Sequence, residues 1–484
     1  MSEQLGSGQE LDLSVRSVGS VRSAWPGWPS LTRRGSPFLI VGAGALLGMT
    51  LLFGLLSEGT FDPGHRVIRD PQALFYDAQA RSVLNGRLDV PPASLGGEAI
   101  SVNGRTYGYF GIGPALLRLP VMAFYPDGYP NLAPWSYLGA FAVEALATLG
   151  IWRTVRRRLE VSAPPIVDGV FVFAVLAASP TVFLIARPDV YEEAILWGVA
   201  GTLVTFWALL RYFETSKWRW GGVAVLAAAF AVLSRPTVGG AALLAVGVSS
   251  LVVVVRDRSR WRPAATLASG AVLGLVAFCS VNYLKFHNVI KPPWQDYANY
   301  LAHPKRLAAV ERGGSTGIRY LPTNLVQYLR PDTLHVDGRF PWVAFRMTRY
   351  APVLNIGHVH FDGLELPTSI SATTPILTVL AVVGSIAILR RPSVLLVPLG
   401  ASVVAILLIA SFFGEAPRYL ADFLPWLVVG SCVGLAVFIN WQPRRKWVRP
   451  LLYMLVSVAL IWSVFVSAAL AHELAHAYRT HNYS

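Results

Sequence analysis

The chain has 484 residues, of which 54% are hydrophobic and only 14% are charged. Soluble domains contain about 25% charged residues, so this composition excludes a large water-soluble enzyme. The 15 Trp, 18 Tyr and 23 Phe residues exclude a disordered chain. The two cysteines, Cys279 and Cys432, both lie in apolar segments, which excludes a disulfide scaffold. The class that remains is a polytopic membrane protein.

Eleven apolar segments predict membrane-spanning helices, because each span needs about 20 mainly apolar residues. They lie at 37–57, 132–152, 165–186, 194–213, 221–234, 238–255, 264–283, 372–389, 394–413, 419–439 and 451–471. The fifth and sixth belong to one apolar run that is too long for a single helix and is interrupted at Arg235-Pro236. The sequence therefore predicts an all-α polytopic fold with two long segments outside the spans.

The predicted spans divide the chain into five parts. Residues 1–36 are rich in Ser, Gly and Arg and predict a disordered cytoplasmic tail. Residues 37–283 form an N-terminal transmembrane core, which includes a first long extracytoplasmic loop at 58–131. The second such loop is 284–371, the C-terminal transmembrane helices lie in 372–471, and 472–484 form an extracytoplasmic tail.

The distribution of Lys and Arg predicts the orientation in the plasma (inner) membrane. With a cytoplasmic N-terminus, about half of the 41 basic residues fall in short inner segments that hold few acids. These basic clusters flank the spans one at a time, so the net charge of +14 does not indicate nucleic-acid binding. The two long loops and all nine histidines then lie on the outer side, where we expect the chemistry of the protein.

The first outer loop contains local signals for three elements. A helix is predicted at roughly 72–84, where Asn85-Gly86 ends it. Two strand-like segments flank Asn103-Gly104, a strong hairpin signal. The apolar segment 111–126 is interrupted by Arg118 and Pro120 and is too short to span, so it predicts an interfacial or re-entrant helix.

Charged residues lie where the outer ends of several spans are predicted. They are Asp70, Asp77, Glu192, Glu193, Arg235, Arg418 and Asp422. A charge that faces lipid costs several kcal/mol, so such residues usually face a cavity or a partner. Arginine binds phosphate through two hydrogen bonds, and a carboxylate can act as a general base on a hydroxyl group. The set therefore predicts an outer cavity that transfers a group from a lipid-phosphate carrier.

The motifs around these residues resemble the GT-C fold glycosyltransferases, and more narrowly the polyprenyl-phosphate-sugar-dependent, family 39-like membrane proteins of actinobacteria. In chain order they are Phe75–Arg81, Asn85–Pro91, Asn103–Tyr107, Tyr109–Pro120, Val190–Trp197, Leu233–Thr237, Asn282–Phe286 and Arg418–Pro425. The resemblance implies a GT-C-like fold and sugar transfer from a polyprenyl-phosphate donor to an extracytoplasmic acceptor, which is a cell-envelope glycan, lipid or protein. The motifs do not identify the sugar.

The resemblance also implies an essential acid in the first outer loop, often within an Asp-Glu pair. This chain has no such pair, because neither Asp70 nor Asp77 is followed by Glu. The base is therefore either of the two, and we prefer Asp77, which lies on the predicted helix. The alternative for Asp77 is a surface ion pair with Arg81, four residues later.

Glu193 is predicted to be a second catalytic acid, which positions the acceptor or a divalent cation. Its alternative role is that of a helix-start charge favoured by the helix dipole. No Asp-x-Asp motif occurs in the outer loops, so no metal is implied. Arg235 and Arg418 are predicted to bind the donor phosphate, and Asp422 is predicted to bind the substrate. Alternatively, Arg418 and Asp422 form an ion pair with each other, because they are four residues apart.

Three tyrosines are further predicted substrate-binding residues. Tyr107 and Tyr109 would stack on a sugar or line the lipid entrance, and Tyr419 directly follows Arg418. Aromatic side chains in such positions are otherwise anchors at the membrane interface.

A second enzyme class is suggested by His472-Glu473-Leu474-Ala475-His476, which matches the HExxH pattern of zinc metalloproteases. Few residues follow it, so a third ligand would have to come from elsewhere, such as His358 or His360. A lipid or solute transporter is the third alternative. Transporters usually have matching broken helices in two halves, whereas this sequence shows one break, at Arg235-Pro236.

Overall fold

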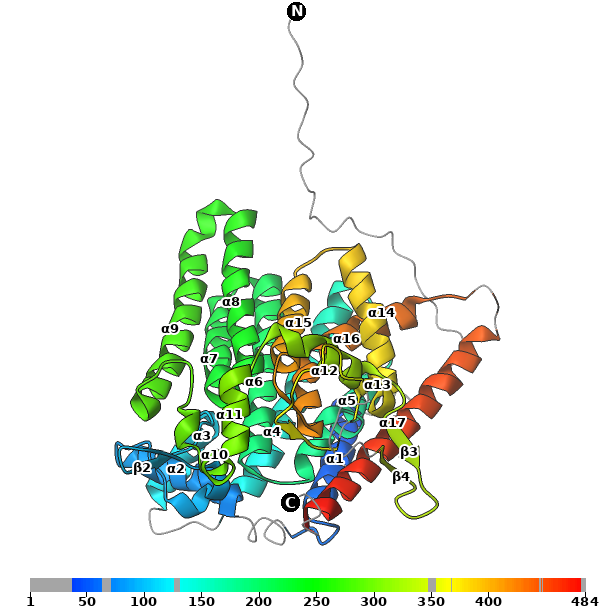
Figure 1. Cartoon of the computed structure of the whole chain (residues 1–484). Helices are drawn as coiled ribbons and strands as arrows, with labels where there is room; N and C mark the ends of the chain where they lie inside the picture. Colours follow the sequence, from blue (N-terminus) through cyan, green and yellow to red (C-terminus); the bar gives the residue numbers. More distant parts are fainter. Residues whose placement is uncertain are drawn as a thin grey trace, which may run out of the picture.

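The computed structural model describes residues 37–62, 71–125, 131–346, 354–366, 368–443, 445 and 447–479. The predicted tail 1–36 and Asp70 lie outside the described residues. Figure 1 shows that the described chain is dominated by a bundle of long helices.

Seven helices of the described chain are long and apolar enough to cross a membrane. They are α1 (Pro37–Leu56), α4 (Ala133–Arg158), α6 (Val190–Thr215), α8 (Pro236–Arg256), α9 (Trp261–Phe286), α16 (Leu424–Asn440) together with the 3-10 helix Pro417–Phe423 that leads into it, and α17 (Val448–Arg479). Five shorter apolar helices are α3 (Gly113–Phe124), α5 (Pro165–Ala177), α7 (Trp218–Ser234), α14 (Pro375–Arg390) and α15 (Leu396–Ala410). Each predicted span contains one of these helices, and the prediction of a polytopic membrane protein is confirmed.

Glycines allow some of these helices to pack very closely. A Cβ atom at Gly384 of α14 would lie 1.9 Å from the carbonyl oxygen of Gly430 in α16. One at Gly434 would lie 2.0 Å from the carbonyl oxygen of Leu380. Small residues at such contacts let helix backbones approach each other in a membrane, where packing replaces the hydrophobic effect.

The predicted break between the fifth and sixth spans is confirmed. Helix α7 ends at Ser234 and α8 begins at Pro236, while Arg235 between them has an extended backbone with φ −138° and ψ 109°. Proline disfavours helical geometry in the residue before it and lacks an N–H donor, which explains the break at this position. The break leaves the Arg235 side chain at the ends of two helices.

The prediction of an all-α fold needs correction, because the described residues also form three short two-stranded sheets. The predicted hairpin is one of them: β1 (Ile100–Val102) and β2 (Arg105–Tyr107) are antiparallel, and Asn103 and Gly104 have positive φ in the turn. The others are the antiparallel pair β3 (Leu334–Val336) and β4 (Val343–Phe345), and the parallel pair β5 (Gly363–Leu364) and β6 (Gly414–Glu415). The fold is therefore mostly helical.

The remaining elements are short helices. The α-helices are α2 (Phe75–Leu84), α10 (Ala298–Ala302), α11 (Pro304–Gly313), α12 (Leu321–Leu329) and α13 (Ile370–Thr373). The 3-10 helices are η3 (Pro71–Leu74), η4 (Pro92–Ser94), η5 (Gly96–Glu98), η6 (Pro180–Ile185), η7 (Arg258–Arg260), η8 (Trp294–Asp296), η9 (Ile318–Tyr320) and η10 (Pro417–Phe423). Helix α2 ends before Asn85 and Gly86, as predicted, and α3 falls in the predicted segment 111–126.

The two segments that were predicted to be outer loops contact each other directly. Figure 1 shows α2, α3, β2 and α10 together at one end of the bundle. The backbone N–H of Ala298 donates to the carbonyl of Ala99 at 2.9 Å, and Ile100 pairs with Tyr297 in an isolated bridge. The first and second segments therefore form one layer over the helix ends.

Basic residues from several connections meet near the other ends of the helices. Arg157 of α4 pairs with Glu214 of α6 at 2.8 Å, and Arg260 donates to the Ser216 hydroxyl at 3.2 Å. The connection between α8 and α9 lies far from α2 and β2 in Figure 1. The basic loops and the layer that contains Asp77 therefore lie at opposite ends of the bundle.

Candidate functional site

A buried arginine joins two of the acids that the sequence analysis selected. Arg118 of α3 donates from Nε to Asp77 at 2.5 Å, and from Nη1 and Nη2 to the two oxygens of Glu193 at 2.6 and 3.0 Å. All three side chains are buried. The pairing connects α2, α3 and the first turn of α6 through charge-assisted hydrogen bonds, which are stronger than neutral ones.

This arrangement occupies both oxygens of Asp77. Its second oxygen accepts from the backbone N–H of Leu132 at 3.1 Å. The ion-pair partner of Asp77 is therefore Arg118, and the surface pair with Arg81 that we considered is not formed. A carboxylate with both oxygens engaged and only 3% exposure is well placed to fix the loop, and less well placed to take a proton from a substrate.

Glu193 has a further hydrogen-bond partner in α4. The hydroxyl of Ser136 donates to Glu193 at 2.5 Å, and the indole N–H of Trp197 donates to the same hydroxyl at 2.8 Å. Glu193 is thus held by α3, α4 and its own helix. It is more than a helix-start charge, because its contacts join three elements.

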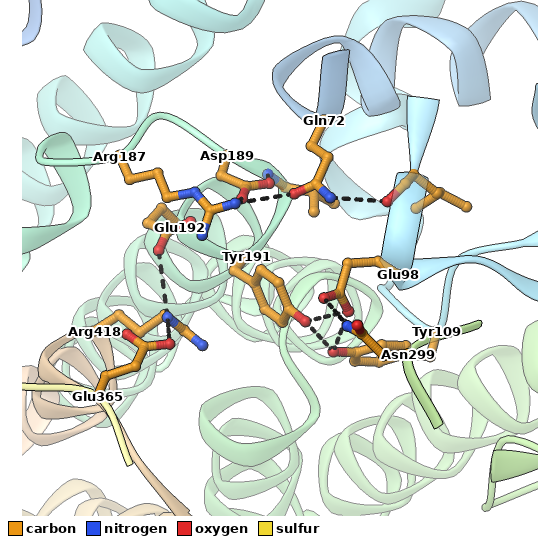
Figure 2. Close-up of polar contacts among 12 residues, drawn as sticks. Gln72, Glu98, Tyr109, Arg187, Asp189, Tyr191, Glu192, Asn299, Glu365 and Arg418 are labelled. Carbon is orange, nitrogen blue, oxygen red and sulfur yellow. Dashed lines mark hydrogen bonds and ion pairs between the residues drawn. The ribbon is translucent and has the colours of Figure 1, made fainter. Parts of the chain in front are cut away.

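The neighbouring Glu192 faces a second arginine. Arg418 of η10 donates to Glu365 at 2.5 Å and lies 3.9 Å from Glu192. Its guanidinium also lies over the ring of Tyr191, 4.7 Å from the centroid. Figure 2 shows Arg418 between the two carboxylates, with Tyr191 beside it. Arg418 therefore pairs with Glu365 and Glu192, and the alternative pair with Asp422 is not formed.

Asp422 is instead the partner of Arg235. The two side chains form an ion pair at 3.3 Å, and the Thr237 hydroxyl donates to the same oxygen of Asp422 at 2.8 Å. The guanidinium of Arg235 lies 5.5 Å from the ring centroid of Tyr419, and that of Arg418 lies 5.2 Å from the same centroid. Two arginines that are far apart in the sequence thus meet at one aromatic ring.

A cluster of tyrosines surrounds Glu98 beside this group. The hydroxyl groups of Tyr191, Tyr297 and Tyr109 all donate to one carboxylate oxygen of Glu98, the last two at 2.6 and 3.3 Å. The amide of Asn299 donates to the other oxygen at 3.3 Å. Figure 2 shows this Glu98 cluster on the far side of Tyr191 from Arg418. It joins both long segments to the start of α6.

The tyrosines of the Glu98 cluster remain protonated donors. Burial raises the pKa of Tyr109 well above its ordinary value, and the negative charge of Glu98 raises it further. The pKa of Tyr297 is raised for the same two reasons. Each hydroxyl group therefore keeps its proton and donates it in a hydrogen bond to the carboxylate.

One predicted residue, Tyr107, has a different position. Tyr107 packs its ring on Phe286 in an apolar cluster that also contains Tyr297, where it supports the layer and is not part of the arginine group. Asp70 lies outside the described residues. Two residues after it, Gln72 accepts a hydrogen bond from Arg187 at 3.3 Å, and Arg187 pairs with Asp189 at 3.0 Å. Figure 2 shows these three side chains next to Glu192.

The structure thus brings together most of the predicted side chains. They form two neighbouring groups. Arg118 joins Asp77 and Glu193, whereas Tyr191 and Tyr419 connect Arg235, Arg418, Tyr109 and Asp422. The two groups are neighbours at the first turn of α6, which contains both Tyr191 and Glu193. Arg118, Glu98 and Glu365 are part of this arrangement and were not among the predicted site residues. Arg118 had a visible signal, since it is a charge inside an apolar run, whereas nothing around Glu365 marks it in the sequence.

The HExxH-like segment takes part in a structural contact. Glu473 accepts a hydrogen bond from the backbone N–H of Phe345 at 3.0 Å, and the ring of His472 lies 5.3 Å from that of Phe340. In the part of the chain that the structure describes, no group of three or more His, Cys, Asp or Glu side chains could hold a metal ion. The carboxylate that would activate a zinc-bound water is bonded to the backbone of β4.

Comparisons with known proteins agree with the motifs. Residues 135–283 match the family described as dolichyl-phosphate-mannose-protein mannosyltransferase. A search of curated proteins finds no match. The fold is similar to the oligosaccharyltransferase of Archaeoglobus fulgidus in its apo form, with a TM-score of 0.53 and 14% identity over 92% of this chain and 57% of that chain.

Two further solved structures are similar. The archaeal oligosaccharyltransferase AglB from Archaeoglobus fulgidus, in complex with an inhibitory peptide and a dolichol-phosphate, gives a TM-score of 0.50 at 14% identity, over 90% of this chain and 55% of that one. ArnT from Cupriavidus metallidurans bound to undecaprenyl phosphate gives 0.44 at 14% identity, over 91% and 78%. The chain spans just over half the length of the archaeal structures that it matches. It has the GT-C fold of membrane glycosyltransferases, which confirms the fold that its motifs predict.

Proposed function

We propose that this protein is a membrane glycosyltransferase that moves a sugar from a polyprenyl-phosphate donor to an extracytoplasmic acceptor. The main observation is that Arg235 and Arg418 meet at the ring of Tyr419, next to several carboxylates at one end of the bundle. The GT-C fold supports a lipid-phosphate donor, since the archaeal relative is described in complex with a dolichol-phosphate. The acceptor is a cell-envelope glycan, lipid or protein.

The two arginines are the proposed ligands of the donor phosphate. Arginine binds phosphate oxygens through paired hydrogen bonds and stays charged at every physiological pH. The Nε atom of Arg235 is buried and has no hydrogen-bond partner among the described residues, which leaves one donor for a phosphate oxygen. Tyr419 and Asp422 hold the Arg235 guanidinium in place, and Glu365 holds that of Arg418.

The proposed transfer needs a base and a leaving group. The acceptor hydroxyl attacks the anomeric carbon, the bond from that carbon to the phosphate oxygen breaks, and the polyprenyl phosphate leaves with its charge balanced by the arginines. A carboxylate takes the proton of the acceptor. Because both oxygens of Asp77 are engaged, we assign this step to Asp70, which lies two residues before Gln72 in the sequence. Asp77 and Glu193 then position the loop, and Tyr109 contributes to substrate binding from within the Glu98 cluster.

The proposed topology keeps the eleven spans and a cytoplasmic N-terminus. Helix α5 is too short to span alone, and η6 continues it after two residues. Helix α3 has an exposed apolar face that includes Leu117 and Phe124, which suits a helix at the membrane surface. In this topology the loops 58–131 and 284–371 cover the site on the outer side, and 472–484 follow the last span there.

The experiment is sugar transfer by the purified chain in lipid vesicles, with a panel of radiolabelled polyprenyl-phosphate sugars. We expect turnover of at least one donor. Asp70→Asn should lower kcat by about 10²–10⁴-fold, the usual loss of a general base, whereas Asp77→Asn should retain most of it. Asp62→Asn, an exposed residue of the same loop, is the matched control. Failure to use any donor, or full turnover by Asp70→Asn, would overturn the proposal.

A further inference from the structure

The hairpin formed by β3 and β4 has exposed apolar side chains at its tip. Val336, Phe340 and Trp342 are 74%, 65% and 51% exposed. The rings of Phe340 and Trp342 pack edge to face, with centroids 5.1 Å apart. A cluster of large, exposed apolar side chains usually marks an interaction surface.

The tip lies along the side of α17. The ring of Trp342 stacks on Phe465, with centroids 6.5 Å apart, and Phe340 contacts His472. Glu473 accepts the backbone N–H of Phe345 at the end of β4. Figure 1 shows both strands beside the lower part of α17. The hairpin is therefore attached to a membrane-spanning helix by side-chain and backbone contacts.

The length of α17 places this contact at the membrane boundary. The helix has 32 residues and is about 48 Å long at 1.5 Å per residue, whereas the hydrocarbon core is about 30 Å thick. Phe465 precedes His472 by seven residues, or about 10 Å along the helix. The sequence places the outer end of the apolar part of this helix at 471. Phe465 precedes that end, so Phe465 and the Trp342 ring stacked on it lie on the membrane side of it.

We infer that the tip of this hairpin, Phe340 to Trp342, inserts into the membrane leaflet at that end of the bundle. The occupant of its exposed apolar surface is then lipid, at the boundary between headgroups and acyl chains. The surface is continuous with the lipid-facing side of α17, where Ile461 is 69% exposed. Aromatic residues, Trp above all, prefer this depth. The nearby Asp337 and Arg339 are exposed charges, which in this arrangement remain at the headgroup level.

The inference gives the HExxH-like segment a structural role. Glu473 fastens β4, and His472 packs on the inserted Phe340, so both side chains hold the hairpin against α17. The base of the hairpin is closed by an ion pair, since Arg346 after β4 pairs with Asp332 before β3 at 3.0 Å. The hairpin therefore anchors this segment to the membrane independently of any sugar chemistry.

The test uses the full chain in lipid vesicles, with Cys279 and Cys432 replaced by Ser and a single cysteine at position 340 labelled with the fluorophore NBD. Asn103→Cys, in the exposed turn of the β1–β2 hairpin, is the matched control. Lipids with a nitroxide near the headgroup should quench the label at 340 several-fold more than the label at 103. Iodide in the water should quench the label at 103 more. Equal iodide quenching at both sites, with no effect of the nitroxide lipid at 340, would overturn the inference.

Two further variants keep the test decisive. Val336→Cys is a second labelling site in the same hairpin, for use if the labelled 340 chain does not enter vesicles, and the same quenching pattern is expected there. Glu473→Ala removes the acceptor for the Phe345 N–H, so the label at 340 should become more accessible to iodide. An unchanged pattern in Glu473→Ala would show that Glu473 does not hold the hairpin in the membrane.

Discussion

Arg118 and Glu193 form a two-point ion pair, 2.6 and 3.0 Å between nitrogen and oxygen, in which both side chains are almost completely buried. The remaining nitrogen of the guanidinium fork, Nε, binds Asp77. One cation therefore serves two carboxylates from different parts of the chain. This ion pair fixes the first long segment against the start of α6. In the same turn of α6, Tyr191 and Glu192 contact Arg418.

The first prediction follows from this pairing. Arg118→Met removes the cation and leaves two buried carboxylates without a cationic partner, so the free energy of unfolding should fall by about 3–5 kcal/mol. Thermal and denaturant unfolding in detergent measure the change. Arg312→Met, at an exposed position of α11, is the control and should change it by about 0.5 kcal/mol or less. Equal stability of the two variants would contradict the buried pairing.

The second prediction concerns pH and Glu415, which lies between α15 and η10. Burial raises the pKa of this carboxyl from 4.5 to about 7. The folded state therefore binds this proton more tightly than the unfolded state does. The contribution of Glu415 to the free energy of unfolding is fully present below pH 4.5 and is lost as the pH rises through 7. The total loss is about 3 kcal/mol.

Glu415→Gln is the variant that isolates this effect. It cannot ionise, so the part of the pH dependence between about 4.5 and 7 should disappear from the free energy of unfolding. Glu311→Gln, at an exposed position of α11, should keep the slope of the parent chain. A slope that is the same in all three proteins would show that Glu415 is already ionised in the folded state.

The third prediction tests whether the Glu98 cluster couples the two long segments. Tyr297→Phe removes a hydrogen bond of 2.6 Å to a carboxylate, which should cost about 1.5–3 kcal/mol of unfolding free energy. Tyr283→Phe, at an exposed position of α9, is the control and should cost much less. Limited proteolysis of 284–371 should accelerate in Tyr297→Phe only, and unchanged cleavage would mean that the segments are coupled elsewhere.

The fourth prediction separates sugar transfer from zinc chemistry. Because Glu473 bonds to the backbone of Phe345, we expect Glu473→Gln, which keeps an acceptor oxygen, to retain full transferase activity. A zinc-selective chelator should leave the activity unchanged, and purified protein should contain far less than one zinc per chain. One equivalent of zinc, with activity lost on chelation, would instead support the metalloprotease alternative.

Much of the fold follows from local properties of the sequence. Apolar length predicts the spans, Pro236 predicts the break before α8, and Asn103-Gly104 predicts the hairpin turn, because each depends on a few adjacent residues. The small sheets β3–β4 and β5–β6 were not predicted. The strands of β5–β6 are two residues long, and they pair Gly363 with Gly414 across fifty residues of sequence.

The site was predicted less completely, for a physical reason. A charge at the end of a span signals a polar environment, which is how Glu193, Arg235 and Arg418 were found. The partner of each charge is set by tertiary packing. Spacing suggested Arg81 for Asp77 and Asp422 for Arg418, whereas Arg118 and Glu365 are the partners in the structure. Pairing across distant segments leaves no periodic signal in one sequence.

The most direct test of the account measures binding of a polyprenyl phosphate to the purified chain in detergent, with a radiolabelled lipid. Arg235→Gln and Arg418→Gln should each weaken binding by at least tenfold, because each removes a charge-assisted contact to the phosphate, worth about 1.5–3 kcal/mol. Arg312→Gln should bind as the parent chain does. Parent-like affinity in both Arg235→Gln and Arg418→Gln would contradict the claim that these two arginines hold the donor.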